Sequence, residues 1–441
     1  MKDTLADSPL PDDERSLYGR TFWWAYVANL LLVAANAITF RFAEYVNFLG
    51  GSEEVTGSIV RAGVIGSIVM RLTLARDLDR LGVRRMWLAT SLLFVAGCLL
   101  TLGAQDVGWQ IYVARVAYTI GLAGMFACSN VHIQSSVPLH RRTEMIASLG
   151  SSGFLGMMVG AQVGDLLFEL LPRSAWLYQA LFGTTLLLGL LYTLIIFGVT
   201  RRDQHVHQPD TPPPWTLLWR YWPGPVVVVA FAVGVCFVAS TVFLTRQATA
   251  LGLVGVRTYF TSYAITAFAF RLLSRTWSRS LGRHRMMLLG LGGHVGGQLL
   301  LIGVDSEWDF ILPALCGGFG HALLFPCVVS LGTEKFPNQY RGTGTTLILG
   351  CIDVGMALAA QPLGWVIDHY GFTQMYLTTA GFCVGTFVFY GALRLNAPDA
   401  DREHQLAAIQ PANSVGRPSP APEAAPCGSS ESLLPVSARP R

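Results

Sequence analysis

The sequence of 441 residues contains little charge: Asp, Glu, Lys and Arg together make up 13% of it, whereas hydrophobic residues make up 52%. Soluble chains carry about 25% charged residues, because a fold of this size must cover a large surface with polar side chains. Many residues of this chain must therefore face lipid rather than water. The same composition excludes global disorder, which requires low hydrophobicity and high net charge.

Lysine is almost absent from the chain. Only Lys2 and Lys335 occur, and neither follows a glycine, so the sequence lacks the G-x-x-x-x-G-K-S/T loop with which ATPases bind phosphate. The formal net charge is only +4 and forms no basic stripe, unlike the charge distribution of a nucleic-acid-binding protein. We therefore expect neither an ATPase nor a nucleic acid as a partner.

The cysteines follow no metal-binding or disulfide pattern. None of the eight forms a C-x-x-C pair, and seven lie in apolar stretches, where cysteine usually serves as a small buried hydrophobic residue. His205 and Asp210 have a spacing used by some acyltransferases, but they lie in a short polar segment with no scaffold around it. We expect no metal, no cofactor and no catalytic residue, and therefore not an enzyme.

Apolar runs of about 20 residues, the length that crosses a bilayer, recur along the chain. Most of them lack Asp, Glu, Lys and Arg, whereas two weaker candidates hold arginines. The twelve predicted spans are 21–40, 55–75, 86–105, 116–137, 145–164, 175–198, 221–245, 256–276, 284–304, 310–333, 342–367 and 370–393. The predicted fold class is all-α, a polytopic membrane protein with twelve transmembrane helices.

Composition divides the chain into five segments. They are an acidic leader (1–20), a first group of six spans (21–198), a polar and Pro-rich linker (199–220), a second group of six spans (221–395) and a disordered tail (396–441). Arginines gather in the connections after spans two, four, six, eight and ten. Because positively charged loops stay inside the cell, we predict an integral protein of the inner (plasma) membrane with both termini in the cytoplasm.

The second group of spans repeats the first. Matching residues recur first at a distance of 200 residues and then of 199. The matches pair Arg71 with Arg271, Gly82 with Gly282, Arg85 with Arg285, Gly156 with Gly355 and Gln162 with Gln361. An even number of spans in each half gives both halves the same orientation, so they are expected to form two six-helix bundles related by an axis along the membrane normal.

The loop between spans two and three carries the residues of a known motif. It reads Ala75-Arg76-Asp77-Leu78-Asp79-Arg80-Leu81-Gly82-Val83-Arg84-Arg85, and a tight turn there requires Gly82. This loop resembles the G-x-x-x-D-R-x-G-R-R/K-R/K motif of the major facilitator superfamily of secondary transporters, although Ala75 replaces the first glycine and Val83 interrupts the arginines. The resemblance implies a gating loop that latches the two halves together, formed by Asp79, Arg80, Gly82, Arg84 and Arg85.

Two further spans are similar to motifs of that superfamily. Span four carries Arg115, for which Glu44 at the far end of span one is a candidate partner, because a buried arginine is costly unless it is paired. Span five carries Gly156, Gly160 and Gly164 on one face, which favours close helix contact. The glycine pattern resembles the antiporter motif of the family, which implies export by exchange.

Polar side chains at mid-membrane depth are the candidates for substrate binding and proton coupling, since they are costly in a bilayer without a use. They are Asn29, Asn36, Arg61, Arg115, Gln162, His321, Asp353 and Gln361. Asp353 and His321 could titrate as the access state changes, although His321 could instead be a hydrogen-bonded core histidine. His294 and Gln298 lie on span nine, an outer span in the family, and are discounted.

The sequence thus predicts a secondary active transporter that moves a small organic solute across the lipid bilayer by alternating access. The expected energy source is a proton gradient or another ion gradient, the expected state is a monomer, and export is one candidate direction. Two alternatives stay open. One is a transporter-like sensor or scaffold that moves no substrate, and the other is a polytopic membrane enzyme.

Overall fold

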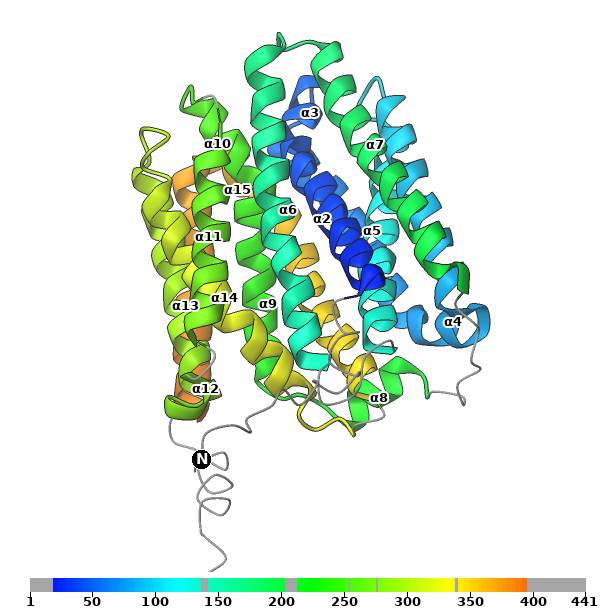
Figure 1. Ribbon diagram of the computed structural model, residues 1–441. Helices are drawn as coiled ribbons and strands as arrows, with labels where there is room; N and C mark the ends of the chain where they lie inside the picture. Colours follow the sequence, from blue (N-terminus) through cyan, green and yellow to red (C-terminus); the bar gives the residue numbers. More distant parts are fainter. Residues whose placement is uncertain are drawn as a thin grey trace, which may run out of the picture. The chain divides into compact units, whose positions relative to one another are not determined.

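The computed structural model describes residues 19–135, 142–202, 212–253, 255–274, 277–337 and 340–394. These residues form helices joined by short turns, and no β-strand occurs among them (Figure 1). In chain order the elements are α2 (Arg20–Ile38), η1 (Thr39–Arg41), α3 (Phe42–Phe48), α4 (Glu53–Leu102), α5 (Trp109–Ser135), α6 (Arg142–Leu170), α7 (Ala175–Val199), η3 (Thr200–Arg202), α8 (Pro214–Arg220), α9 (Val226–Val238), η4 (Ala239–Phe243), α10 (Leu244–Ala250), α11 (Arg257–Leu273), α12 (Trp277–Ser280), α13 (Arg283–Leu300), η6 (Leu301–Gly303), α14 (Ile311–Thr333) and α15 (Arg341–Arg394).

The described helices confirm the all-α membrane fold. Ten stretches are long and apolar enough to cross a membrane, and the last of them, α15, contains two helices that meet at Gly371. With α11, which has 17 residues, the chain supplies the twelve crossing helices that the sequence predicts. The first one is longer than the predicted 21–40, because α2, η1 and α3 continue the helical path to Phe48.

Glycines make the sharp turns between consecutive spans. Gly82 has φ 78° inside α4, and Gly371 has φ 82° inside α15. Gly282, which lies 200 residues after Gly82, precedes α13 with φ 81°. This left-handed backbone carries no steric cost only in glycine. The structure therefore confirms the tight turn expected at Gly82 and shows that its repeat counterpart turns the chain in the same way.

Small residues bring the helices of each half into close contact. An ideal β-carbon at Gly156 of α6 would lie 2.6 Å from the carbonyl oxygen of Leu30 in α2, and one at Gly355 of α15 would lie 2.3 Å from that of Phe231 in α9. Gly156 and Gly355 are repeat counterparts, so the two halves share one packing geometry. The close contact predicted for span five is confirmed at Gly156, whereas Gly164 has only Arg41 nearby, at 3.9 Å.

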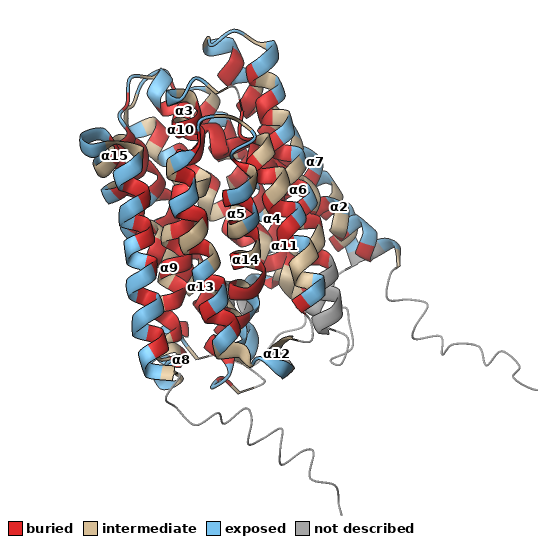
Figure 2. Cartoon of the chain, turned by 90° about the vertical axis from the view of Figure 1, so that its left-hand side faces the viewer, coloured by how far each residue is buried: buried red, intermediate tan, exposed pale blue. Residues whose placement is uncertain are grey.

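Burial follows the contacts between helices rather than the polarity of the residues. The interior faces of the helices are buried, whereas large apolar side chains such as Leu92, Leu194 and Val388 are exposed (Figure 2). Exposed apolar surface on this scale is unusual in a soluble protein. It fits helices whose outward faces contact lipid.

The two halves meet mainly where α4 packs against α15 and where α6 packs against α11. We call the end of the bundle that carries α3 and α10 the α3 end, and the opposite end, with α8 and α12, the α8 end (Figure 1). At the start of α4, ideal β-carbons at Gly57 and Gly364 would each lie 2.1 Å from a backbone oxygen of the other half, in Ala360 and Glu53. The halves are therefore packed backbone to backbone at the α3 end.

Candidate functional site

Asp353 links the two halves through an ion pair. Its Oδ2 accepts hydrogen bonds from Nε of Arg71 and Oγ of Ser67, both at 2.7 Å and both on α4. The Arg71 and Asp353 side chains are 15% and 13% exposed. The sequence identified Asp353 as a mid-membrane carboxylate and Arg71 only as a repeat match. The structure adds that they form a pair across the interface between α4 and α15.

Two carboxylates at the α3 end cap helices of the opposite half. Asp368 of α15 accepts hydrogen bonds from the backbone N–H groups of Glu53 (3.0 Å) and Glu54 (2.8 Å) at the start of α4. Asp165 of α6 accepts them from Val256 (2.7 Å) and Arg257 (2.6 Å) at the start of α11. Helix N-termini favour negative charge. The caps therefore hold the α3 ends of the two halves together, on repeat-related pairs of helices but not at repeat-related residues.

Asp165 also forms an ion pair with Arg41, inside the first half. Only 3% of the Arg41 side chain and 1% of the Asp165 side chain are exposed. In the sequence Asp165 only follows Gly164, the last of the three glycines of span five. Its role becomes visible only when α6, α11 and the η1 turn are placed around it.

The candidate pairing of Glu44 with Arg115 is wrong. Glu44 accepts a hydrogen bond from Nη1 of Arg246 at 3.0 Å, and Nε of Arg246 donates to Glu53 at 2.6 Å. Arg115 instead lies over the rings of Phe42 (4.5 Å from the centroid) and Tyr118 (5.2 Å). The physical reason is that α3 contacts α10 of the second half, which brings Glu44 beside Arg246.

Three more predicted polar residues contact the opposite half. Arg61 donates to Oε1 of Gln361 at 2.9 Å, and Nε2 of Gln361 lies 3.3 Å from Oε1 of Glu54. Gln162 donates to Oγ1 of Thr261 in α11 at 3.1 Å. The repeat-related glutamines therefore both bridge the halves.

The two predicted asparagines bond within the first half. Asn29 donates to Oγ of Ser152 at 2.7 Å, which links α2 to α6. Asn36 accepts a hydrogen bond from the Tyr118 hydroxyl at 3.2 Å. Both amides are thus hydrogen-bonded to side chains of the first half. The position of a polar residue in a span does not distinguish this structural role from substrate binding.

His321 of α14 lies among aromatic rings from four helices. The ring centroids of Phe154, Phe237, Tyr263 and Phe325 are 6.0, 5.3, 5.9 and 5.4 Å from the imidazole centroid. Its buried Nδ1 has no hydrogen-bond partner among the described residues. The environment is therefore unlike that of a hydrogen-bonded core histidine.

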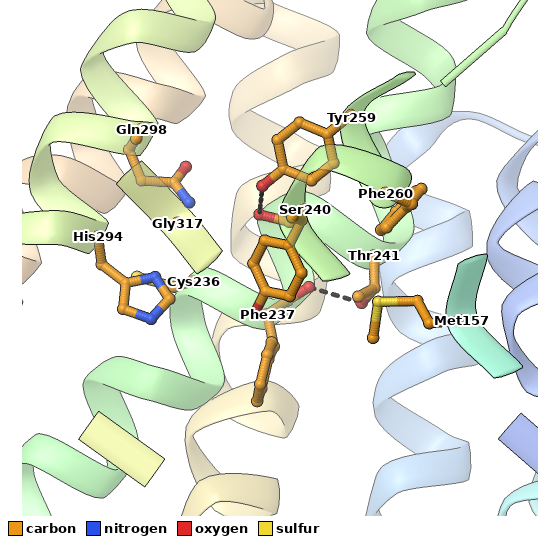
Figure 3. Close-up of a pocket in the computed structure, with 12 residues that line it drawn as sticks. Met157, Cys236, Phe237, Ser240, Thr241, Tyr259, Phe260, His294, Gln298 and Gly317 are labelled. Atoms are coloured by element: carbon orange, nitrogen blue, oxygen red, sulfur yellow. Dashed lines mark hydrogen bonds between the residues drawn. The ribbon is translucent and has the colours of Figure 1, made fainter. Parts of the chain in front are cut away.

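A small cavity lies beside this aromatic cluster in the second half (Figure 3). Its volume of about 20 Å³ suits one or two water molecules. The π-helical turn η4 contributes Ser240 and Thr241, and Tyr259 donates to the Ser240 hydroxyl at 3.4 Å. His294 and Gln298 of α13, which the resemblance to the family places on an outer span, also line this cavity. Within the described chain, Nε2 of His294 and Oε1 of Gln298 are buried without a hydrogen-bond partner.

The gating loop is described in part. Arg84 lies over the Phe197 ring at 5.7 Å and donates to the backbone oxygen of Arg201 at 3.4 Å, both in the first half. Arg85 is exposed. The side chains of Asp79 and Arg80 lie outside the described residues, so the latch itself stays a prediction.

Comparison with known proteins identifies the family. A sequence model of the Major Facilitator Superfamily matches residues 22–360 and 259–431. The chain belongs to this superfamily. The resemblance drawn from the gating loop and the repeat is therefore confirmed, and the protein is a membrane transporter with a small-molecule substrate rather than an enzyme.

Individual relatives of this superfamily transporter are distant. The staphylopine export protein of Staphylococcus aureus is 22% identical over 369 residues, which cover 80% of this chain and 90% of that protein. The probable metabolite transport protein CsbC of Bacillus subtilis is 24% identical over 392 residues, covering 76% and 81%.

Solved structures show the same fold. The nucleoside transporter NupG has a TM-score of 0.67 at 13% identity, and the match covers 86% of this chain and all of the other. A D-xylose-proton symporter also has a TM-score of 0.67, at 15% identity, and the match covers 84% and 96%. At these identities the similarity shows the fold alone.

The contacts of this transporter connect its halves at two levels. The caps and the Arg246 pairs lie at the α3 end, and the Asp353–Arg71 pair lies further along. Fifteen residues separate Asp353 from Asp368 in α15, which corresponds to about 22 Å at 1.5 Å per residue. Among the described ion pairs at the α8 end, Arg283–Glu334 stays within one half. The described conformation is therefore held together most strongly at the α3 end.

Proposed function

We propose that this protein is a secondary active transporter that moves a small organic solute across the cell membrane by alternating access, and that a proton gradient drives it. In this proposal it works as a monomer with both termini in the cytoplasm, so the α3 end faces outward. The observation that carries the proposal is the Asp353 carboxylate, which connects two halves that have to separate during transport.

Asp353 suits a coupling role because its partners belong to the opposite half. An ionised carboxylate attracts Arg71 and accepts from Ser67 across the interface, at 2.7 Å in each case. Protonation of Asp353 removes its charge and with it the ionic attraction between α15 and α4. A proton and Arg71 therefore compete for the same carboxylate. The halves are joined at Asp353 when Arg71 is bound and are not joined there when the carboxylate is protonated.

Proteoliposomes that contain a pH-sensitive dye test the coupling. The wild-type protein is screened against small metabolites and drugs for solutes that cause proton movement. We expect Asp353→Asn to abolish that movement while the protein still inserts and folds, because the amide cannot exchange a proton. Asp305→Asn, in an exposed turn, is the matched control and should behave as the wild type. Unchanged proton movement in Asp353→Asn would disprove the coupling role.

Export is the direction that we propose. Its support is the glycine-rich face of α6, which packs against α2, together with a relative whose name describes export. In inside-out vesicles, a solute that passes the first screen should accumulate when the interior is acidified. Accumulation only in right-side-out vesicles would show uptake instead, and solute flux of either kind would exclude a sensor without transport.

A further inference from the structure

The internal repeat allows each contact between the halves to be compared with its counterpart. Arg71 of α4 corresponds to Arg271 of α11, 200 residues later, and Asp353 of α15 corresponds to Phe154 of α6, 199 residues earlier. Ser67, the second partner of Asp353, corresponds to Ala267. The repeat therefore keeps the arginine at the second position, but it replaces both the carboxylate that pairs with the arginine at the first position and the serine that donates to that carboxylate.

The structure places these counterparts in the same relation. The guanidinium of Arg71 bonds to Asp353, and the guanidinium of Arg271 lies 5.6 Å from the ring centroid of Phe154. Phe154 and Ala267 pack in one buried cluster at the contact of α6 with α11. The arginine thus faces the opposite half at both positions, but at the second it meets a phenyl ring instead of a carboxylate.

Arg271 has no anionic partner in the described part of the chain. Its ring contacts are Phe154 at 5.6 Å and Phe325 at 5.9 Å, and the described ion pairs do not include it. A cation–π contact compensates a buried guanidinium far less than a carboxylate does. A partly buried guanidinium without a counter-charge is costly, so the position favours an anion that comes from elsewhere.

Other polar atoms without partners lie beside Arg271. The Tyr263 hydroxyl and the Nδ1 atom of His321 are buried and have no hydrogen-bond partner among the described residues. Phe154 and Phe325 contact both Arg271 and His321, and the Tyr263 ring lies 5.9 Å from that of His321. We call these five residues the Arg271 cluster. It combines a cation, a hydroxyl donor and aromatic walls.

We propose that the Arg271 cluster binds the transported solute, and that this solute is an organic anion with a carboxylate and a planar or aromatic body. The carboxylate pairs with Arg271 and accepts from Tyr263, and the body packs against Phe154 and Phe325. The inference rests on the proposed transport function. The bound anion joins α6 to α11 as Asp353 joins α15 to α4, so the solute completes the second of two repeat-related bridges between the halves.

Binding to the purified full-length protein tests the substrate class. The probes are benzoate, phenylacetate and indole-3-acetate, each compared with its uncharged amide by isothermal titration calorimetry. We expect at least one carboxylate to bind, and its amide to bind roughly tenfold more weakly or worse, since the amide cannot form the charge-assisted pair. Failure of all three carboxylates to bind, or equal binding of acid and amide, overturns the proposal.

Two variants localise the charge requirement. Arg271→Gln should abolish the preference for acid over amide, whereas Arg285→Gln, an exposed arginine of the same half, should keep it. Phe154→Asp places a carboxylate of the protein beside Arg271 and should therefore also abolish binding of the carboxylate probes. Phe154→Leu adds no charge and should retain the preference for acid over amide. Preference retained in Arg271→Gln refutes the assignment. A third result would refute this inference alone: solutes drive proton movement that depends on Asp353, but anionic solutes are not preferred over neutral ones. That result would leave the proposed transport function intact.

Discussion

Removing one partner of the buried ion pair between Arg41 and Asp165 is expected to destabilise the protein more than removing an exposed carboxylate at the α3 end. In Asp165→Asn, the amide oxygen can still accept from the N-terminus of α11, but the neutral amide carries no charge to pair with Arg41. The two side chains are 3% and 1% exposed, and removing one partner of a buried ion pair costs about 3–5 kcal/mol because the other charge remains buried.

Asp368→Asn provides the matched comparison. Asp368 also caps a helix of the opposite half through two backbone N–H groups, but its side chain is exposed and no described ion pair includes it. Asparagine keeps one of the two acceptor oxygens and caps helices about as well as aspartate, so the cost should be at most about 1 kcal/mol. Both variants thus leave an amide oxygen to cap a helix of the opposite half, and they differ in the buried charge that is left unpaired.

Thermal unfolding in detergent, followed by tryptophan fluorescence at one fixed scan rate, measures the difference. Asp165→Asn should lower Tm by several degrees and Asp368→Asn by much less. Adding Arg41→Met to Asp165→Asn should cost little more, since paired residues are strongly non-additive. Equal shifts in the two single variants, or fully additive losses in the double variant, would refute the reasoning.

Two further predictions concern the α3 end and an exposed turn. Gly57→Ala places a β-carbon 2.1 Å from a carbonyl oxygen of α15, so α4 and α15 must separate. A cysteine introduced by Ser52→Cys should then react faster with an impermeant maleimide. The control is Gly183→Ala, whose β-carbon has no atom within 4 Å and should leave the reaction rate unchanged. In the turn before α14, the Ser306 hydroxyl and nearby backbone N–H groups lower the pKa of Asp309, so its stabilising contribution is present above the ordinary carboxyl pKa and is lost as the pH falls through the lowered value. Ser306→Ala should raise the Asp309 pKa in a carboxyl-carbon NMR titration, and an unchanged pKa would contradict the assignment.

Local sequence signals were sufficient for the secondary structure and the repeat. A run of apolar residues must form a helix in lipid, since every backbone polar group has to be satisfied within the segment. Gly82 turns the chain because its φ of 78° is accessible to glycine at no steric cost. Both arguments depend only on neighbouring residues, and so the twelve crossing helices and their turns could be predicted without knowledge of the packing.

The partners of the charged residues could not be predicted in this way. A helix that is apolar on all sides gives no periodic signal for the face that points inward, so the sequence offers Glu44 only as a candidate partner of Arg115 and does not show that it meets Arg246. The contacts that define the site join residues far apart in the chain, such as Arg71 and Asp353.

The sequence by itself therefore determined the membrane class, the two related halves and the short set of polar residues within the spans. Only the tertiary structure decided which of them face the opposite half. The physical reason is that lipid sets the length and composition of a helix, whereas the rotation of each helix about its axis is set by packing against its neighbours. The contrast between Arg71, held by Asp353, and Arg271, beside Phe154, required both the repeat and the packing.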